Sequence, residues 1–335
     1  MEILKNYREA PPEGPGSALT IGNFDGVHLG HRALLNRVVS AGNRESLVPT
    51  VLTFEPHPAR VLGGRPAPPL LTTRADKRRL LASAGIMRLI EQPFTLEWAA
   101  QSPEVFVREV LVDALRCRRV VVGYDFVFGA RRGGTLETLI AAGRRFDFAV
   151  EVIEALAPGE AGVVSSSRIR EAIAAGEVER ATALLGRPYH LEGRVVRGAQ
   201  RGRQLGYPTA NLQGENELVP PAGVYAGWLD WGETPRMAAI SVGTNPTFGD
   251  TGLTVEAHVL REQLEPGTDL YGRECHLAFG HCLRGQVRFS GPDALTHLVA
   301  QIEADVQETR RRLTEAVRPE SLGPGSSWAP RAGTP

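Results

Sequence analysis

The chain has 335 residues, 42% hydrophobic and 23% charged, which is typical of a soluble globular protein with room for two domains. Lysine plus arginine and aspartate plus glutamate balance at 38 each, which argues against a general nucleic-acid binder because such proteins carry a basic excess. No apolar run could cross a bilayer, the N-terminus lacks a signal-peptide core and three cysteines are too few for a disulfide framework, so we expect a cytoplasmic protein without membrane binding.

The first half of the chain alternates between strand-like and helix-like segments. The strand-like segments are short, apolar and β-branched, at residues 18–21, 47–54, 86–90, 118–122 and 148–153. The helix-like segments have helical spacing, at residues 32–39, 74–84, 103–115 and 134–145. This alternation predicts a Rossmann-like parallel sheet with helices on both faces. Ligands of such sheets bind where the strands end.

The turn at residues 22–31, G-N-F-D-G-V-H-L-G-H, lies between the first strand and a helix. The free N–H groups and dipole of a helix start favour phosphate, and Gly22 and Gly30 let a ligand approach the backbone. His28 and His31 are three residues apart, so both can face that ligand. Two alternatives are a plain turn with solvated histidines and a metal-binding pair, for which no third ligand of matching spacing lies nearby.

Two further stretches suit the same chemistry. A turn at residues 123–129 follows a later strand, and parallel strands place it at the same sheet edge as the first turn. At residues 164–170, V-S-S-S-R-I-R, Ser165, Ser166 and Ser167 open a helix and Arg168 adds a fork of donors that suits phosphate. Plain N-capping is the alternative. No G-x-x-x-x-G-K-[ST] and no G-x-G-x-x-G after a strand is present, so a P-loop kinase and a dinucleotide enzyme are unsupported.

The first turn and the serine-rich helix start together resemble the two signatures of the HxGH nucleotidyltransferases. The resemblance implies that His28, His31 and Arg168, with the three serines, act at a nucleoside triphosphate. It also implies that a further set of residues lines the nucleotide site, namely Gly22, Asn23, Phe24, Gly30 and Asp125. Phe126-Val-Phe128 stands where the family commonly has an aromatic-basic-aromatic run, so no phosphate role is expected of residue 127.

After residue 185 the sequence pattern changes from helical spacing to short strand-like segments separated by Gly, Pro and Asn. These segments lie at residues 189–197, 223–231, 237–242, 254–260 and 274–284. This pattern is typical of an antiparallel barrel or sandwich. An apolar stripe at helical spacing predicts a last helix at residues 292–313. We therefore expect a first domain at 1–186, a second at 187–316 and a disordered tail at 317–335.

The second half carries polar features that a plain barrel does not need. A glycine-rich loop contains Gly198, Gly202 and Gly206, which we expect to bind the phosphates of a nucleotide. Thr209 and Asn211 point the same way on an extended segment, and their oxygens suit Mg²⁺ beside phosphate. Glu256 lies inside a strand pattern, where a solvated glutamate is the alternative, just as Thr-Ala-Asn can be a simple turn.

The pairs Cys275-His276 and His281-Cys282 look like a zinc box. Strand alternation puts Cys275 and His281 on one face and His276 and Cys282 on the other. We therefore expect no structural metal from these four residues, because they could not converge without a sharp bulge.

Several motifs resemble the riboflavin kinase barrel: G-x-V-x-x-G at 193–198, P-T-A-N at 208–211, G-V-Y at 223–225, P-T-F at 246–248 and V-E-x-H at 255–258. With the first-half signatures, the chain from about residue 17 to 315 resembles the bifunctional riboflavin kinase/FMN adenylyltransferases, the prokaryotic FAD synthetases. Residues 260–262, Leu-Arg-Glu, stand where that family usually has an Asp-Phe pair.

This resemblance implies the ligands riboflavin, FMN and ATP, with FMN as intermediate, FAD as product, Mg²⁺ bound with ATP and no tightly bound prosthetic group. It implies that Glu256 is the general base of the kinase and that Thr209 and Asn211 hold the magnesium. The rivals are a single-activity nucleotidyltransferase with a non-catalytic flavin-binding barrel, and a flavin-binding regulatory module without catalysis. Oligomerisation is compatible with the sequence, which does not specify it.

Overall fold

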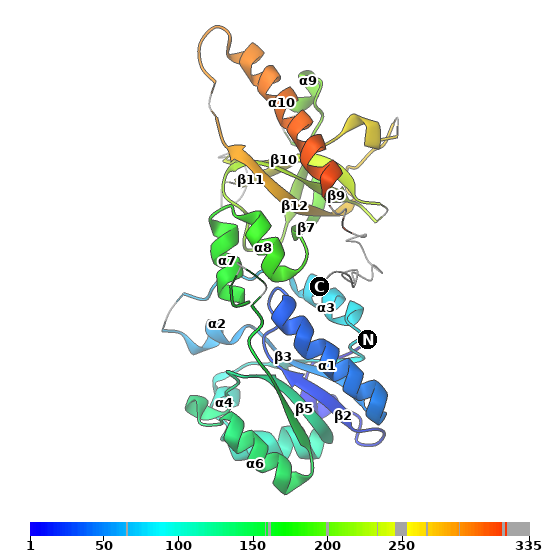
Figure 1. Ribbon diagram of the computed structural model, residues 1–335, viewed down its shortest axis with the longest axis vertical. Helices are drawn as coiled ribbons and strands as arrows, with labels where there is room; N and C mark the ends of the chain where they lie inside the picture. The colour runs from blue at the N-terminus through cyan, green and yellow to red at the C-terminus, as the bar shows by residue number, and fades with distance from the viewer. Residues whose placement is uncertain are drawn as a thin grey trace. The chain divides into compact units, whose positions relative to one another are not determined.

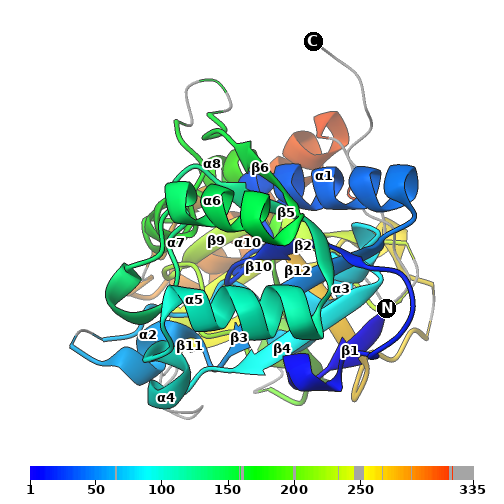
Figure 2. The same cartoon turned by 90° about the horizontal axis from the view of Figure 1, so that it is seen from below.

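The structure is a computed structural model that describes residues 1–64, 66–157, 159, 162–198, 201–232, 234–244, 253–265, 267–287, 289–316 and 319. The chain forms two compact units, shown in Figures 1 and 2. Unit 1 comprises Met1–Pro69 and Lys77–Val164, and unit 2 comprises Leu70–Asp76 and Ser165–Pro335. The P-T-F motif at 246–248 and, apart from Pro319, the expected tail lie outside the described residues. The expected domain boundary at residue 186 stays a prediction.

Unit 1 is built on a six-stranded parallel sheet in the order β1-β4-β3-β2-β5-β6. The strands are β1 (Glu2–Leu4), β2 (Ser17–Ile21), β3 (Val48–Glu55), β4 (Arg88–Pro93), β5 (Cys117–Gly123) and β6 (Ala149–Ile153). The helices are η1 (Tyr7–Glu9), α1 (Leu29–Glu45), α2 (Pro58–Leu62), α3 (Arg74–Ser83), α4 (Leu96–Ala99), α5 (Pro103–Val105), η2 (Phe106–Ala114), η3 (Ala130–Arg132) and α6 (Leu136–Phe146). The first residues of α3 belong to unit 2. The predicted parallel sheet is confirmed.

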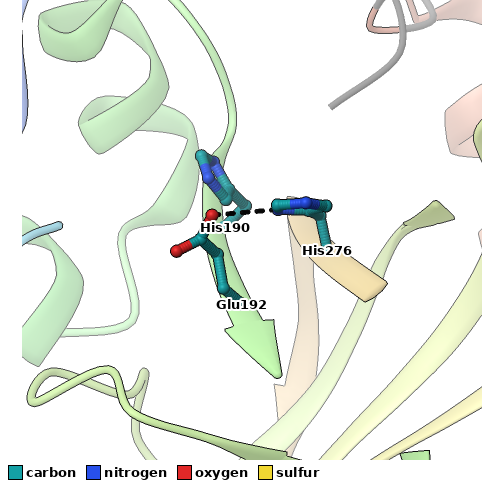
Figure 3. Close-up of side chains that lie close together, drawn as sticks. All are labelled: His190, Glu192 and His276. Carbon is teal, nitrogen blue, oxygen red and sulfur yellow. Dashed lines mark ion pairs between the residues drawn. The ribbon is translucent and has the colours of Figure 1, made fainter. Parts of the chain in front are cut away.

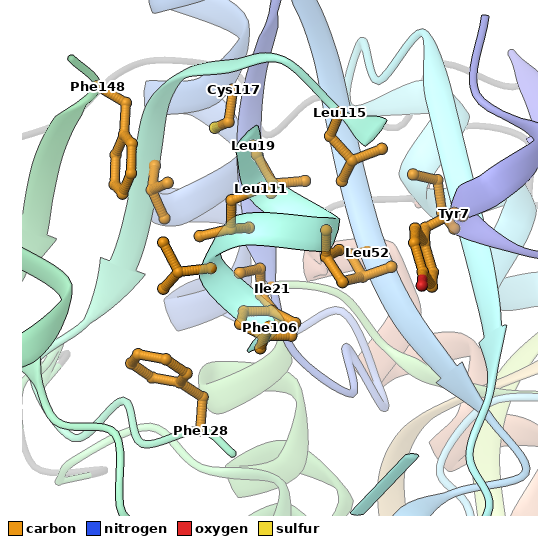
Figure 4. Close-up of a cluster of buried hydrophobic side chains, with 14 of the residues drawn as sticks. Tyr7, Leu19, Ile21, Leu52, Phe106, Leu111, Leu115, Cys117, Phe128 and Phe148 are labelled. Carbon is orange, nitrogen blue, oxygen red and sulfur yellow. The ribbon is translucent and has the colours of Figure 1, made fainter. Parts of the chain in front are cut away.

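Alternate residues of the strands pack on opposite faces of this sheet. On β2, Ala18 joins a core with α1 and α3, whereas Leu19 joins a second core with η2 and α6. On β3, Val51 and Leu52 divide in the same way. Figure 4 shows part of the second core, around Phe106. Both faces are apolar because helices cover both, as expected for a parallel sheet.

The helix expected at 103–115 begins with α5, where Ser102 Oγ accepts the Val105 N–H at 3.3 Å. It continues as the π-helix η2, which sequence spacing does not distinguish from an α-helix. The strand β1 is also absent from the sequence prediction, because three residues are too few to show an alternation.

An ion pair between a partly exposed arginine and a buried carboxylate joins α3 to β4. The Arg78 guanidinium donates from Nε and Nη2 to the Glu91 carboxylate at 2.7 and 2.5 Å, and the Glu91 side chain is only 1% exposed. This hydrogen bonding raises the pKa of Arg78. Arg78→Ala is expected to lower the free energy of unfolding of unit 1 by about 3 kcal/mol, since it strips two charge-assisted bonds from a buried carboxylate.

The matched control is Arg118→Ala in the same unit, whose side chain is 59% exposed and whose partner Asp147 is 99% exposed. Exposed pairs contribute about 1 kcal/mol or less, so this change should cost much less. Urea unfolding of the two variants measures the difference, and equal costs would contradict it.

Unit 2 contains a closed barrel of six antiparallel strands in the order β10-β11-β8-β7-β12-β9. The strands are β7 (Tyr189–Val196), β8 (Ala210–Gly214), β9 (Gly223–Asp230), β10 (Arg236–Thr244), β11 (Leu253–Val259) and β12 (Glu274–Gly285). The helices are α7 (Ser166–Ala174), α8 (Val178–Leu185), α9 (Arg201–Gln204), η5 (Arg261–Gln263) and α10 (Ala294–Glu315). Of the two expected alternatives, the barrel is confirmed. No helix in the described part of the chain is long and apolar enough to span a membrane.

The last helix, α10, packs on the barrel strands β9, β10 and β12. Arg284 at the end of β12 donates from Nε and Nη2 to the Asp305 carboxylate of α10, at 2.9 and 2.5 Å. Gln301 adds a hydrogen bond to the same carboxylate at 3.0 Å. The predicted C-terminal helix is therefore confirmed, and it is fixed to the barrel by polar contacts as well as by its apolar stripe.

Candidate functional sites

The chain between β2 and α1 turns through an unusual backbone conformation. Phe24 and Val27 have positive φ angles of 50° and 39°, and Gly26 has 82°. The turn is held by the fully buried Phe24 ring and by Thr53, whose hydroxyl donates to the Asn23 carbonyl at 3.1 Å. Non-glycine residues in this region cost about 1–3 kcal/mol each and are found preferentially at ligand-binding sites.

The two histidines of this turn lie against each other. His28 is the N-cap of α1, and its Nδ1 accepts the His31 N–H at 3.2 Å. Their rings stack with centroids 3.6 Å apart. Because Nδ1 accepts a hydrogen bond, the neutral His28 ring carries its proton on Nε2, an inference from the hydrogen bond rather than an observed proton. Nε2 of His28 is therefore a hydrogen-bond donor rather than an acceptor.

A side chain at position 30 would crowd this pair. A Cβ at Gly30 would lie 3.3 Å from the His28 ring, tighter than ordinary van der Waals contact. His28 is itself only 6% exposed, so the ring has little room to give way. Asp25 in the same turn is also buried, at 4% exposure, and the sequence analysis did not single it out.

The second predicted turn leaves the same sheet edge. β2 and β5 are parallel neighbours, so the turns that follow them emerge together. β3 lies on the other side of β2, which makes this edge a topological switch point, where α/β sheets bind ligands. Asp125 is exposed here, and a Cβ at Gly123 would lie 3.2 Å from its Oδ1.

The serine-rich segment has the N-capping geometry named as its alternative. Ser165 Oγ accepts the Arg168 N–H at 3.3 Å at the start of α7, while Ser166 and Ser167 occupy the first turn. These residues open unit 2, whereas His28 and His31 belong to unit 1. Their joint use of one triphosphate therefore stays a proposal.

In the barrel, three of the predicted residues meet. Glu256 on β11 lies directly opposite Asn211 on β8 in the antiparallel register. The Thr209 hydroxyl donates to Glu256 Oε2 at 3.0 Å. The proton of Thr209 is thus directed at the carboxylate, which leaves the oxygen lone pairs for a cation, and Glu256 Oε1 stays available to a second partner.

Two residues outside the predicted set hold this arrangement. The Arg261 guanidinium donates to the Gly206 carbonyl at 2.7 Å, and His258 Nδ1 lies 2.9 Å from the Pro208 carbonyl. Burial lowers the pKa of His258. These two contacts join the loop before Thr209 to β11, the strand that carries Glu256, and to the residues that follow it. The available signal was the histidine of V-E-x-H, which is quoted above as a motif but not as a site residue.

A side chain is disfavoured at each of the three predicted loop glycines, for a different reason at Gly206 than at the other two. A Cβ at Gly198 would lie 2.4 Å from the Asn211 side-chain amide, and one at Gly202 would lie 2.3 Å from the Tyr207 carbonyl oxygen. Gly206 has a φ of 87°, which disfavours any side chain. The glycine loop therefore lies directly against the residues that carry the polar site.

A cavity of about 400 Å³ adjoins Asn211. It lies between β7, β8 and β11, and its apolar lining includes Leu191, Val196, Leu212 and Leu253. A cavity with an apolar wall and a few polar groups is the usual setting for an organic ligand.

The comparisons with known proteins cover both units. Residues 10–168 match the family described as FAD synthetase, and residues 185–313 match the family described as riboflavin kinase. The chain is 36% identical over 307 residues to the bifunctional riboflavin kinase/FMN adenylyltransferase of Escherichia coli strain K12, covering 91% of this chain and 96% of that protein. It belongs to the bifunctional riboflavin kinase/FMN adenylyltransferase family.

The chain is also similar to a second protein of this name and to one solved structure. The Listeria monocytogenes protein of the same name is 36% identical over 296 residues, covering 87% of this chain and 91% of that one. A crystal structure titled as a macrolide-efflux protein from Streptococcus pneumoniae superposes with a TM-score of 0.79 at 29% identity, over 92% of this chain and 98% of that one. The fold of most of the chain is thus shared with that structure.

The close approach of Gly198 and Asn211 yields a testable expectation for the kinase barrel. Gly198→Ala places a Cβ where the Asn211 amide lies, so the amide must move. Displacing a positioning group by about 1 Å costs up to about 10²-fold in rate. We expect riboflavin phosphorylation to fall by about tenfold or more while FMN adenylylation is unchanged. Separate assays of the two steps measure this, with Gly285→Ala, where a Cβ meets nothing within 4 Å, as the control.

Proposed function

We propose that this family member makes FAD from riboflavin in two ATP-dependent steps, with phosphorylation in the barrel of unit 2 and adenylylation at the β2–α1 turn. The observation that carries the proposal is the Thr209–Glu256 hydrogen bond opposite Asn211, because it places a base beside oxygen ligands. The β2–α1 turn supplies the second, separate phosphate-binding arrangement.

In the kinase step, the 5′-hydroxyl of riboflavin attacks the γ-phosphate of ATP. Glu256 accepts the hydroxyl proton through Oε1 while Oε2 stays bonded to Thr209. The O–P bond of FMN forms, the bond to the β-phosphate oxygen breaks and ADP leaves. Thr209 and Asn211 orient the phosphates, so that positioning supplies most of the rate.

The divalent cation that accompanies ATP fits this barrel. The hydroxyl oxygen of Thr209 and the amide oxygen of Asn211 are hard ligands, which Mg²⁺ prefers, and the nearby carboxylate of Glu256 adds negative charge. We propose that Thr209 and Asn211 hold Mg²⁺ here. When bound, Mg²⁺ neutralises charge on the phosphates.

In the adenylylation step, a phosphate oxygen of FMN attacks the α-phosphate of ATP and pyrophosphate leaves. His28, through Nε2, and His31 donate to the triphosphate and stabilise the charge that moves onto pyrophosphate. The free N–H groups at the start of α1 add to this stabilisation. Ser165, Ser166, Ser167 and Arg168 are proposed to bind the same triphosphate, with Gly22, Asn23, Phe24, Gly30 and Asp125 lining the nucleotide site.

Labelled ATP tests this division of labour. With γ-labelled ATP, riboflavin and Mg²⁺, label should enter FMN and persist in FAD. With α-labelled ATP, label should enter FAD alone and never FMN, because only the second step transfers the adenylyl group. Label from α-labelled ATP in FMN, or an FAD that lacks the γ-label, would overturn the proposed sequence of steps.

Unpaired cysteines at positions 117, 275 and 282 agree with a proposed cytoplasmic location.

A further inference from the structure

A cluster of metal-ligand side chains lies at a different place in the barrel from Glu256. His190 and Glu192 are on β7, and His276 is on β12 (Figure 3). Each offers one ligand atom, and these atoms all lie within 4.8 Å of one another. Among the described residues, these three form the group of histidine, cysteine or carboxylate side chains that lie close enough together to hold a metal ion.

The strand register explains the convergence. Glu192 and His276 are directly opposite in the antiparallel β7–β12 pair. His190 is two residues before Glu192 and therefore points to the same face of the sheet. The three side chains are thus placed by backbone geometry on rigid strands, which is the setting that holds a metal site most accurately.

The separations suit a tetrahedral ion. His276 Nδ1 lies 3.4 Å from Glu192 Oε1. Ligand atoms about 2.1 Å from a tetrahedral zinc are about 3.4 Å from one another, so this pair already has the required spacing. No two ligand atoms of the group are more than 4.8 Å apart, so movements of about 1.4 Å or less would bring every pair to the spacing of a tetrahedral site.

Two polar residues, Asp76 and Thr73, contact these ligands and orient them. Asp76 Oδ2 lies 3.2 Å from His190 Nε2, and both side chains are only 3% exposed. This contact is the carboxylate–histidine arrangement common at zinc sites, in which the carboxylate fixes the orientation of the imidazole. The Thr73 hydroxyl donates to Glu192 Oε2, and Asp76 N donates to Thr73 Oγ1 at 3.0 Å. Thr73 and Asp76 both belong to unit 2.

We propose that His190, Glu192 and His276 form a binding site for a first-row divalent metal ion of the zinc class, oriented by Asp76. Two imidazole nitrogens and one carboxylate oxygen select zinc over Mg²⁺, which prefers oxygen ligands. Three protein ligands leave a fourth position for water. The His276 and Glu192 side chains are 12% and 17% exposed, so an ion can enter from solvent.

This site is distinct from the residues proposed to hold Mg²⁺. Asn211 pairs with Val196, four residues along β7 from Glu192, a distance of about 13 Å on a strand. The site shares only His276 with the zinc box considered in the sequence. β12 shifts register between Phe279 and His281, so the strict alternation assumed there fails at Gly280, where Trp228 leaves no room for a side chain. Cys275 is buried and Cys282 exposed, and both are unpaired.

Metal titration of the full chain tests the proposal. The protein is stripped with a chelator, dialysed and titrated with Zn²⁺ by calorimetry, and with Co²⁺ by visible absorption, in the absence of ATP. We expect one equivalent to bind with a tetrahedral cobalt spectrum, and Zn²⁺ to raise the melting temperature. His276→Ala and Glu192→Gln should each lower the affinity by tenfold or more, and Asp76→Asn by about 10- to 100-fold.

The matched controls are His281→Ala and Cys282→Ser, which alter the same strand outside the cluster. Both should bind as the unmodified protein does. FMN formation by each variant shows that its barrel is folded. The proposal is overturned if the unmodified protein binds no equivalent of Zn²⁺, if His276→Ala and Glu192→Gln bind normally, or if binding is lost in the controls instead.

Discussion

Glu256→Gln is expected to lower kcat of riboflavin phosphorylation by about 10²- to 10⁴-fold, the usual contribution of a general base. A glutamine side chain can still accept the Thr209 hydroxyl, so the local geometry is kept while the proton acceptor is lost. Adenylylation of FMN should continue at its normal rate, because that step uses the other proposed site. Steady-state assays with riboflavin and with FMN as separate substrates measure the two effects.

The control is Glu274→Gln, which removes a carboxylate whose side chain is 82% exposed on β12. It should leave both steps unchanged. Riboflavin phosphorylation that survives Glu256→Gln undiminished would show that the base has been assigned to the wrong residue, and would favour a barrel that binds flavin without acting on it.

The second large effect is expected at His28. His28→Ala should slow FAD formation from FMN by about 10²- to 10³-fold, as when a preorganised donor to a transition state is removed. FMN formation should be nearly unchanged. Because His28 is also the N-cap of α1, alanine should in addition cost about 1 kcal/mol of stability.

His28→Asn separates these two roles. Asparagine is a preferred N-cap and can accept the His31 N–H, but it has no imidazole to place against the triphosphate. This variant should keep the normal melting temperature and still lose FAD formation. Full activity in His28→Asn would show that His28 acts only as a helix cap. Loss of both steps in a folded His28 variant would contradict the proposal of two separate sites.

Much of the fold could be predicted because local patterns decide it. The strands β2, β3 and β5 are short apolar runs, and Pro103 after Ser102 marks a helix start in both sequence and structure. The sequence predicts only an extended segment around Asn211, because the five residues of β8 include just two apolar ones, Ala210 and Leu212, too few to mark a strand. Their place in the barrel is set by pairing with β7 and β11, which is a long-range property.

The sites divide in the same way. The meeting of His28 with His31 follows from their spacing at one helix start. The Thr209–Glu256 bond, in contrast, joins residues that no local period relates, and only the family resemblance suggested that they act together. The contact of Asp76 with His190 could not be predicted at all, because it joins an early helix start to the barrel through the tertiary fold.

The most direct test is chromatography of the products formed by the purified protein with riboflavin, ATP and Mg²⁺. We predict that FMN appears first and that FAD follows as FMN is consumed, because the chain holds both proposed sites. FMN without FAD would contradict the assignment of His28 and His31. If no product forms from riboflavin and FMN supplied directly also yields no FAD, the bifunctional activity itself would be contradicted.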